Sequence, residues 1–153
     1  MALESNKAPR RYVSRKRWDD LSCVHRNWRG AERMQVLHGY ARSVEIEFIA
    51  SHLDHSGVVI DFSSLSSVKH ILEDQFDHTL LVAEDDPLRE SLTSLADQGA
   101  ADIRLMQSVT LEGSAAWVVE HVSIVVRKLT DGRVSISRVE IREGPKNAVI
   151  MNV

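Results

Sequence analysis

A strict alternation of apolar and polar residues runs from Ser43 to Phe48, within a strand-like segment that begins at His38, and it constrains the fold more than any other feature of the chain. Positions 43, 45 and 47 are polar, and positions 44, 46 and 48 are apolar. This period of two is typical of a β-strand with one buried face. Because residues two apart in a strand point the same way, Tyr40 and Arg42 share the face of the apolar residues with His38. The sequence therefore predicts a strand whose buried face continues into polar side chains.

The remaining segments predict further strands and two main helices. The expected elements are strands at 18–26, 133–143 and 147–151, helices from Ser63 or Ser64 and from Thr110, a short amphipathic helix across Leu88, Leu92 and Leu95, and an extended piece at 103–106. This order predicts an α+β domain, an antiparallel β-sheet with two main helices on one face. Such a sheet has open edges, so pairing of subunits into an oligomer is expected.

Length and composition indicate a single domain. The chain has 153 residues, of which 43% are hydrophobic and 27% are charged, an ordinary globular balance. Residues 1–17 read as a basic N-terminal arm, 18–153 as the domain, and about 84–107 as an insertion between the helices. The arm is expected to be solvated, and contact with a partner subunit or an anionic ligand is the alternative.

Charge and hydropathy argue against two classes of partner. The net charge of -3 argues against a general nucleic-acid binder on electrostatic grounds. No apolar run is long enough to span a bilayer, and no signal-peptide pattern opens the chain. We therefore expect no membrane partner and a cytoplasmic protein.

Two histidines at the ends of neighbouring strands are candidate metal ligands. A catalytic zinc site takes three protein ligands and leaves one position open. His25 and His38 supply two ligands, and either Cys23, on the face of His25, or Tyr40 is placed to supply a third. On these residues alone, packed or solvent-facing histidines are the more ordinary interpretation, and a lone cysteine is more often a small buried apolar residue.

Two further positions carry candidate chemistry. Asp77 precedes His78 at the exit of the first helix, and a carboxylate beside an imidazole fixes its tautomer and raises its basicity. Glu143 stands where an alternating strand ends. Taken alone, the pair is a helix-exit cluster and Glu143 is a surface carboxylate.

Six short elements, in order along the chain, resemble the family of 6-pyruvoyltetrahydropterin and 6-carboxytetrahydropterin synthases. The elements, each followed by the family pattern that it resembles, are Leu21-Ser22-Cys23-Val24-His25 (Phe-Ser-Ala-Ala-His), Leu37-His38-Gly39-Tyr40 (Leu-His-Gly-His), 58–65 (Gly-Met-Val-Met-Asp-Phe-X-X-Leu), 76–81 (Leu-Asp-His-X-X-Leu), 109–112 (Pro-Thr-X-Glu) and 139–143 (Val-X-Val-X-Glu). The resemblance implies a tunnelling fold (T-fold) whose subunits join their sheets into a β-barrel, with active sites between subunits.

The same resemblance implies roles for individual residues. The family's three zinc ligands fall on His25, His38 and Tyr40, and its acid-base pair falls on Asp77 and His78. The carboxylate that anchors the pterin ring falls on Glu143, and Thr110 is carried over as a substrate-binding residue. A carboxylate suits two parallel donors on a planar heterocycle.

The chain departs from the family pattern at the metal, at the catalytic thiol and in the insertion. Tyr40 replaces the third histidine, and a phenol must lose its proton, with a reference pKa near ~10, to bind zinc well. Met34 stands where the family has a catalytic cysteine, and a thioether has no ionisable proton. Cys23 and Glu32 are the candidates to compensate. The 84–107 insertion is expected to reshape the site entrance or the subunit contacts.

The resemblance implies a zinc-dependent lyase of the 6-carboxytetrahydropterin synthase type. It would convert 7,8-dihydroneopterin triphosphate to 6-carboxy-5,6,7,8-tetrahydropterin with release of acetaldehyde and triphosphate, a step that feeds queuosine and other 7-deazaguanine products. Arg26, Arg29 and Arg42 are candidates for the triphosphate. The alternative is a divergent or catalytically inactive homologue that binds a pterin or purine-like ring or acts as an oligomeric structural component.

Overall fold

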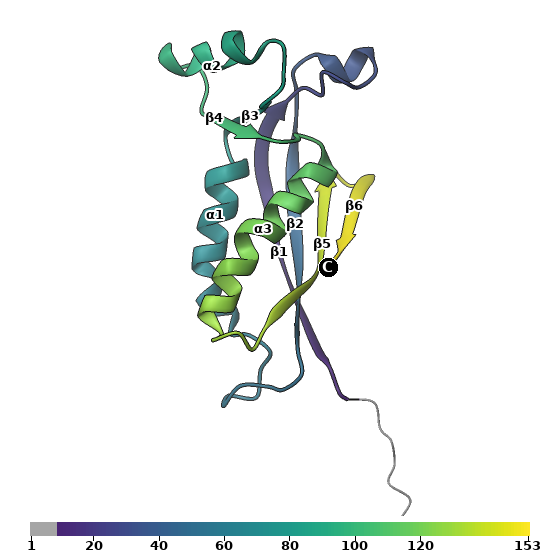
Figure 1. Cartoon of the computed structure of the whole chain (residues 1–153), viewed down its shortest axis with the longest axis vertical. Coiled ribbons are helices and arrows are strands. Elements are labelled where there is room, and N and C mark those ends of the chain that lie inside the picture. Colours follow the sequence, from purple (N-terminus) through teal and green to yellow (C-terminus); the bar gives the residue numbers. More distant parts are fainter. Residues whose placement is uncertain (1–8) are drawn as a thin grey trace, which may run out of the picture.

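The computed structural model describes residues 9–153, and residues 1–8 of the predicted arm lie outside the described residues. The elements are β1 (Tyr12–His25), the 3₁₀ helix η1 (Glu32–Gln35), β2 (His38–Ala50), the 3₁₀ helix η2 (Phe62–Leu65), α1 (Ser66–Phe76), β3 (Thr79–Ala83), α2 (Arg89–Asp97), β4 (Ile103–Met106), α3 (Leu111–Leu129), β5 (Ser135–Glu143) and β6 (Asn147–Asn152). Figure 1 shows α1 and α3 side by side against one face of the long strands.

The strands form one six-stranded sheet in the order β4-β3-β1-β2-β5-β6. Strands β1, β2, β5 and β6 are antiparallel, as the sequence predicts. The two remaining strands are parallel additions, because β3 pairs with the end of β1 and β4 pairs with β3. The α+β class and the two helices on one face are confirmed, and the sheet itself is mixed.

The two faces of β3 pack against different helices. Leu81 belongs to the main core, which also contains the buried residues of α1 and α3. Leu80 and Val82 pack instead with Leu92 of α2 in a second, smaller cluster. A five-residue strand buried on both faces shows no alternation, which is why the sequence pattern does not reveal β3.

Strand β1 begins earlier than the sequence predicts. Residues 12–17, assigned above to the basic arm, pair with β2 along their length. Arg15 forms an ion pair with Glu47 across the two strands at 2.9 Å, and the ammonium group of Lys16 lies 5.9 Å from the ring centroid of Trp18. Pairing with the distant strand β2 makes this segment a strand, and its basic local sequence gives no sign of that pairing.

Two register shifts decide which side chains face the helices. Strand β1 pairs Trp18 with Val44 but Leu21 with Arg42, so two residues oppose one, and Asp20 has a positive φ of 62°. A bulge of this kind swaps the two faces of the strand beyond it. After the shift, the buried positions of β1 are odd-numbered and include His25.

Strand β5 carries an equivalent shift. It pairs Ile136 with Phe48 but Arg138 with Glu47, which leaves Ser137 as the extra residue. The buried positions change from even to odd, and the new parity leads along the strand to Glu143. Two bulges therefore bring the ends of β1 and β5 onto the helix-bearing face of the sheet.

Candidate functional site

The candidate site lies on the helix-bearing face, where β1, β2 and β5 come together. His25 and His38 are direct partners across β1 and β2, and their ring centroids lie 4.5 Å apart. Tyr40 follows on the same face, with its ring centroid 5.7 Å from that of His38. Glu143 is the partner of Arg42 across β2 and β5. The structure thus brings together the two predicted histidines, Tyr40 and the predicted ring-binding carboxylate.

Arg42 lies at the centre of this group and is only 1% exposed. Its Nη1 donates to Ser114 Oγ at 2.7 Å. Its Nη2 has three acceptors nearby, namely Glu143 Oε1 at 3.2 Å, the carbonyl oxygen of Val109 at 3.2 Å and His25 Nδ1 at 3.3 Å. A guanidinium can only donate, and the two N–H groups of Nη2 are shared among its three acceptors. Arg42 therefore joins both neighbouring strands to the start of α3.

The contact with Arg42 determines the tautomer of His25. Because Nδ1 accepts from Arg42, the proton of the neutral imidazole is on Nε2. That nitrogen lies 3.7 Å from Glu143 Oε1. Burial is the main cause that lowers the pKa of His25 from 6.5 to about 3, and the neighbouring Arg42 and His38 add to it. His25 is accordingly neutral at neutral pH.

The ring of His38 is held differently. Its Nδ1 lies 2.7 Å from the carbonyl oxygen of Val36, and a carbonyl only accepts, so Nδ1 carries the proton and Nε2 keeps a lone pair. Tyr40 beside it is 43% exposed. His38 Nε2 and the Tyr40 hydroxyl are thus the accessible polar groups of this pair.

Cys23, the predicted replacement thiol, is the partner of Tyr40 across β1 and β2. It is 2% exposed, and burial raises the pKa of its thiol. A reactive cysteine needs a lowered pKa and partial exposure. This environment is that of a packed side chain, and its catalytic role stays a prediction without support from the local environment.

The donor set does not fit a zinc ion. Of the three predicted ligands, His38 alone presents a free imidazole lone pair, because His25 Nδ1 accepts from Arg42 and His25 Nε2 is protonated. Tyr40 offers a phenol, and the Arg42 guanidinium would repel a divalent cation beside His25. Within residues 9–153, no three His, Cys, Asp or Glu side chains are grouped as a metal site. The arrangement does not support the predicted zinc centre.

The Asp77 and His78 pair lies away from this group. Asp77 Oδ1 accepts from the backbone N–H of Ser22 at 3.2 Å and lies 3.0 Å from His78 Nδ1. His78 lines a cavity of about 400 Å³ together with Ser22 and Val24, which point to the face opposite Cys23 and His25. The predicted acid-base pair is therefore formed, but on the other face of the sheet from His25.

Thr110 has a structural task at the start of α3. Its hydroxyl oxygen accepts from the backbone N–H of Gly113 at 3.0 Å and caps the helix, which begins where the sequence predicts it. The neighbouring Val109 carbonyl accepts from Arg42. Thr110 thus positions the end of α3 that contacts Arg42, and its role in substrate binding stays a prediction.

The loop after β1 is held by the first residues of the insertion. Arg26 makes two hydrogen bonds of 2.8 Å to Asp86. Arg29 pairs with Asp85 at 2.5 Å, and Asp85 also accepts from Trp28 Nε1 at 3.1 Å. With Arg42 buried, all three arginines predicted for a triphosphate are paired with carboxylates of the chain itself.

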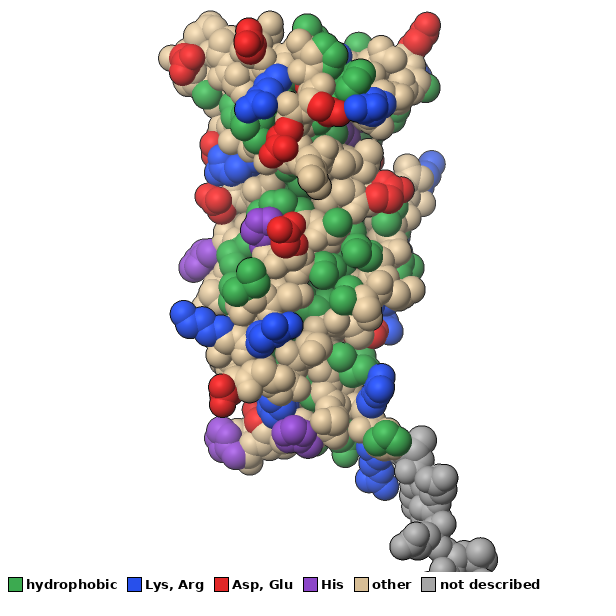
Figure 2. Space-filling model, viewed as in Figure 1, with side chains coloured by type: hydrophobic (Ala, Val, Ile, Leu, Met, Phe, Trp, Pro, Cys, Tyr) green, Lys and Arg blue, Asp and Glu red, His purple; other side chains and the backbone are tan. Residues whose placement is uncertain are grey.

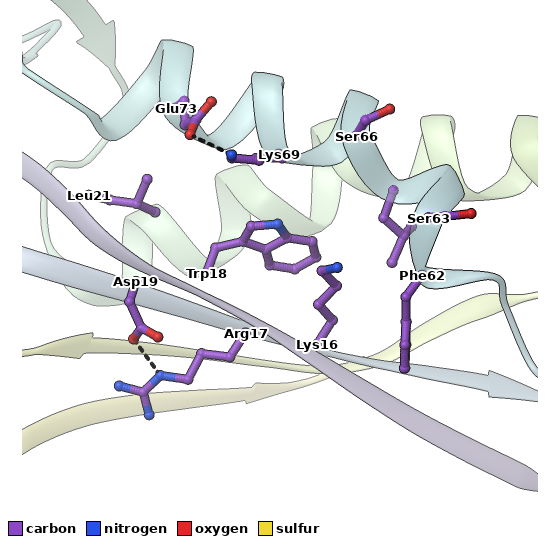
Figure 3. A pocket seen from close by; sticks show the side chains of 11 residues that line it. Lys16, Arg17, Trp18, Asp19, Leu21, Phe62, Ser63, Ser66, Lys69 and Glu73 are labelled. Carbon is purple, nitrogen blue, oxygen red and sulfur yellow. Dashed lines mark hydrogen bonds and ion pairs between the residues drawn. The ribbon is translucent and has the colours of Figure 1, made fainter.

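A separate cavity of about 450 Å³ lies between β1 and the start of α1. Figure 3 shows Lys16, Trp18 and Phe62 at its wall, with Arg17 paired to Asp19 and Lys69 paired to Glu73. None of the predicted site residues lines it. On the face shown in Figure 2, basic and acidic side chains are interspersed with hydrophobic ones. That face of the described residues has no continuous basic patch.

Sequence reasoning missed the central position of Arg42 and the role of Ser114. The signal for Arg42 was available, because the alternation of β2 places it on the apolar face, where an arginine needs a carboxylate partner. Ser114 is fully buried in the first turns of α3. Nothing in the local sequence distinguishes it from other helical serines.

Solved structures share this fold. A protein of Wolinella succinogenes described as uncharacterized matches with a TM-score of 0.78 at 23% identity, over 93% of this chain and 98% of that one. A 6-pyruvoyl tetrahydropterin synthase of Caenorhabditis elegans matches with a TM-score of 0.63 at 16% identity, over 94% and 96%. The 6-pyruvoyl tetrahydropterin synthase of Plasmodium vivax matches with a TM-score of 0.61 at 17% identity, over 93% and 99%. The chain thus has the tunnelling fold of the pterin synthases, as predicted.

The family model described as 6-pyruvoyl tetrahydropterin synthase matches residues 13–152, and the chain belongs to this family of pterin enzymes. Curated relatives from Rickettsia felis and Rickettsia conorii, both named 6-carboxy-5,6,7,8-tetrahydropterin synthase, are 36% and 35% identical over 68 residues. These matches cover 44% of this chain and 49% of each relative. The chain thus spans about half the length of the relatives it matches. Within residues 9–153, none of the helices has the length and hydrophobicity to cross a bilayer.

Proposed function

We propose that this chain is a divergent member of its family that binds a pterin or a closely related planar ring at Glu143. The observation that carries the proposal is the position of that carboxylate, held by Arg42 at the end of a buried sheet face. Its side chain is 15% exposed. Within the described residues, the hydrogen bond to Glu143 uses Oε1. Oε2 therefore remains available to a ligand.

The chemistry of such a ring matches this carboxylate. The amino-pyrimidine edge of a pterin presents two parallel N–H donors, and a carboxylate accepts two parallel donors with good geometry. His38 Nε2 and the Tyr40 hydroxyl stand on the same face as further polar contacts. A few convergent polar groups beside apolar side chains are what such a ring needs for its orientation.

Three features favour binding over the zinc-dependent conversion. The first is the donor set, in which both ring nitrogens of His25 face other groups of the chain. Met34 replaces the family thiol, and Cys23 is buried with a raised pKa. The arginines predicted for the triphosphate have carboxylate partners.

The second candidate is the 6-carboxytetrahydropterin synthase reaction itself, with its place in queuosine and 7-deazaguanine synthesis in the cytoplasm. The pairing of Asp77 with His78 favours it, since the imidazole is 87% exposed and ready for an outside ligand. The names of the Rickettsia relatives point the same way.

Either candidate includes assembly of identical chains. His78 and His25 lie on opposite faces of one sheet, so a site that uses both needs residues from a second copy. The 12–20 part of β1 pairs on one side with β2, while β3 reaches only its last residues. Strand β6 forms the other edge of the sheet. Open edges of this kind are suited to pairing between subunits.

The test is incubation with 7,8-dihydroneopterin triphosphate, with and without added zinc, followed by product analysis. Binding of neopterin is measured in parallel by calorimetry on the wild-type protein and on Glu143→Gln. We expect binding that depends on Glu143, and no acetaldehyde. Glu45→Gln is the matched control, because Glu45 is a half-buried carboxylate of β2 paired with Arg138. Acetaldehyde release at a steady rate would reject binding without conversion and support the synthase reaction.

A further inference from the structure

A buried guanidinium occupies the centre of the site, in contact with His25, one of the three residues that the family resemblance assigns to a metal. Arg42 lies on β2 two residues beyond Tyr40 and four beyond His38, on the same strand face. It is 1% exposed. Arginines are almost never buried to this extent unless they are paired. The partners of Arg42 therefore indicate why it is there.

Two of those partners are functional candidates. Arg42 Nη2 donates to His25 Nδ1 at 3.3 Å and to Glu143 Oε1 at 3.2 Å. The first contact removes the lone pair through which His25 Nδ1 could bind a metal and leaves the proton on Nε2. The second balances the charge of the ring-binding carboxylate. One side chain thus contacts both halves of the predicted site.

The remaining partners hold the guanidinium in place from the helix side. Nη1 donates to the fully buried Ser114 Oγ at 2.7 Å, and Nη2 also contacts the Val109 carbonyl at 3.2 Å. Both groups belong to the start of α3 or the residues before it. The orientation of Arg42 is therefore set by two strands and one helix, which makes it a rigid positive charge.

We propose that Arg42 is a positioning residue that takes the place of a metal: it holds His25 and Glu143 in their binding orientations, and the chain binds its ligand without zinc. The part that concerns the ligand rests on the proposed binding at Glu143. The part that concerns the metal is independent of it. Tyr40 fits the same assignment, because a site without zinc has no need of a third imidazole.

The first experiment measures zinc. Wild-type protein, Tyr40→His, Arg42→Met and the double variant Tyr40→His/Arg42→Met are titrated with zinc chloride and then assayed for metal content. We expect no stoichiometric zinc in the wild type or in Tyr40→His, because Arg42 still donates to His25 Nδ1 in both. We expect the double variant to bind zinc at least about 10-fold more tightly than Tyr40→His. The matched control is Arg138→Met, a β5 arginine paired with Glu45 and Glu140 away from the site.

Three results would overturn the proposal. One is wild-type protein with one zinc per chain that is lost in His38→Ala. Another is Tyr40→His with zinc affinity equal to that of the double variant. The third is a folded double variant that gains no zinc affinity. If circular dichroism shows that Arg42→Met is unfolded, the wild-type and Tyr40→His titrations still decide the matter.

A second measurement reports directly on His25. Nitrogen-15 spectra of the imidazole rings distinguish a protonated Nε2 from a protonated Nδ1. We expect the Nε2–H form of His25 in the wild type, and we expect zinc chloride to leave it unchanged. Arg42→Met should lose this preference for Nε2–H, and Arg42→Lys should keep part of it. An Nδ1–H form in the wild type would contradict the assignment. Loss of neopterin binding in every protein would instead reject the proposed function and leave the zinc results valid.

Discussion

Two groups that contain histidine lie on opposite faces of one sheet, an inner group around His25 and His38 that is largely buried and an outer pair of Asp77 and His78 that is exposed. His25 is 5% exposed, and each of its ring nitrogens faces a group of the protein. The side chain of His78 is 87% exposed and bonds only to Asp77 within the described residues. The inner cluster is a site built by three strands and a helix, whereas the outer pair is available to a molecule outside this chain. The presence of both motifs in one chain does not by itself place them in one site.

The strongest test of this difference is deletion of Asp20. The extra residue at the β1 bulge is what places His25 on the helix-bearing face. Without it, the register moves by one residue, and Leu21, Cys23 and His25 turn toward the face of His78. Loss of these buried side chains is expected to cost more than about 5 kcal/mol, comparable with the whole stability of a domain. Denaturant unfolding measures the loss, and an unchanged midpoint would contradict the role of the bulge.

The inner histidine should also make stability depend on pH. The pKa of His25 is lowered to about 3 in the folded protein, whereas the unfolded value is near ~6.5. The unfolded chain therefore binds a proton that the folded chain does not, between these two values. The contribution of His25 to the free energy of unfolding is complete above pH ~6.5. It falls by up to about 1.4 kcal/mol per pH unit as the pH is lowered to ~3. Unfolding curves of wild type and His25→Gln should differ by this slope, and parallel curves would argue against a neutral buried His25.

Ligand binding should separate the two clusters. Glu143→Gln removes the charge and one of the two acceptor oxygens, which is expected to weaken neopterin binding by about 1.5–3 kcal/mol, or roughly 10- to 150-fold. His78→Ala should leave the same affinity unchanged, because His78 lies on the other face. Calorimetry on both variants makes the comparison. Equal losses would place both residues in one binding site, as an assembly of several chains would allow.

The smallest expected effect concerns the backbone of the outer pair. His78 has a positive φ of 57°, a conformation that costs residues with a Cβ roughly 1 kcal/mol. His78→Gly should therefore be more stable than His78→Ala by about 1 kcal/mol, although both lack the imidazole. Thermal unfolding of the two variants tests this. A more stable alanine variant would mean that His78 adopts another conformation in solution.

Local patterns account for much of the fold. The alternation of β2 predicted the shared face of His38, Tyr40 and Arg42, and the apolar pattern after Thr110 predicted where α3 begins. Near the first helix, the prediction of a start at Ser63 or Ser64 was close, but Asp61 caps the 3₁₀ helix η2 by accepting from the backbone N–H of Ser63 at 2.9 Å, and α1 follows from Ser66. These features depend on neighbours in sequence, so the local sequence is enough to predict them.

The site depended on contacts that no local pattern contains. Arg42 and Glu143 are 101 residues apart and meet only because β2 and β5 pair. The faces of His25 and Glu143 were decided by two bulges, each a single extra residue whose position is set by long-range strand pairing. The sequence by itself determined the elements, the family and the residues available for chemistry. Only the tertiary structure decided that Arg42 lies among them, because burial and hydrogen bonding depend on distant strands.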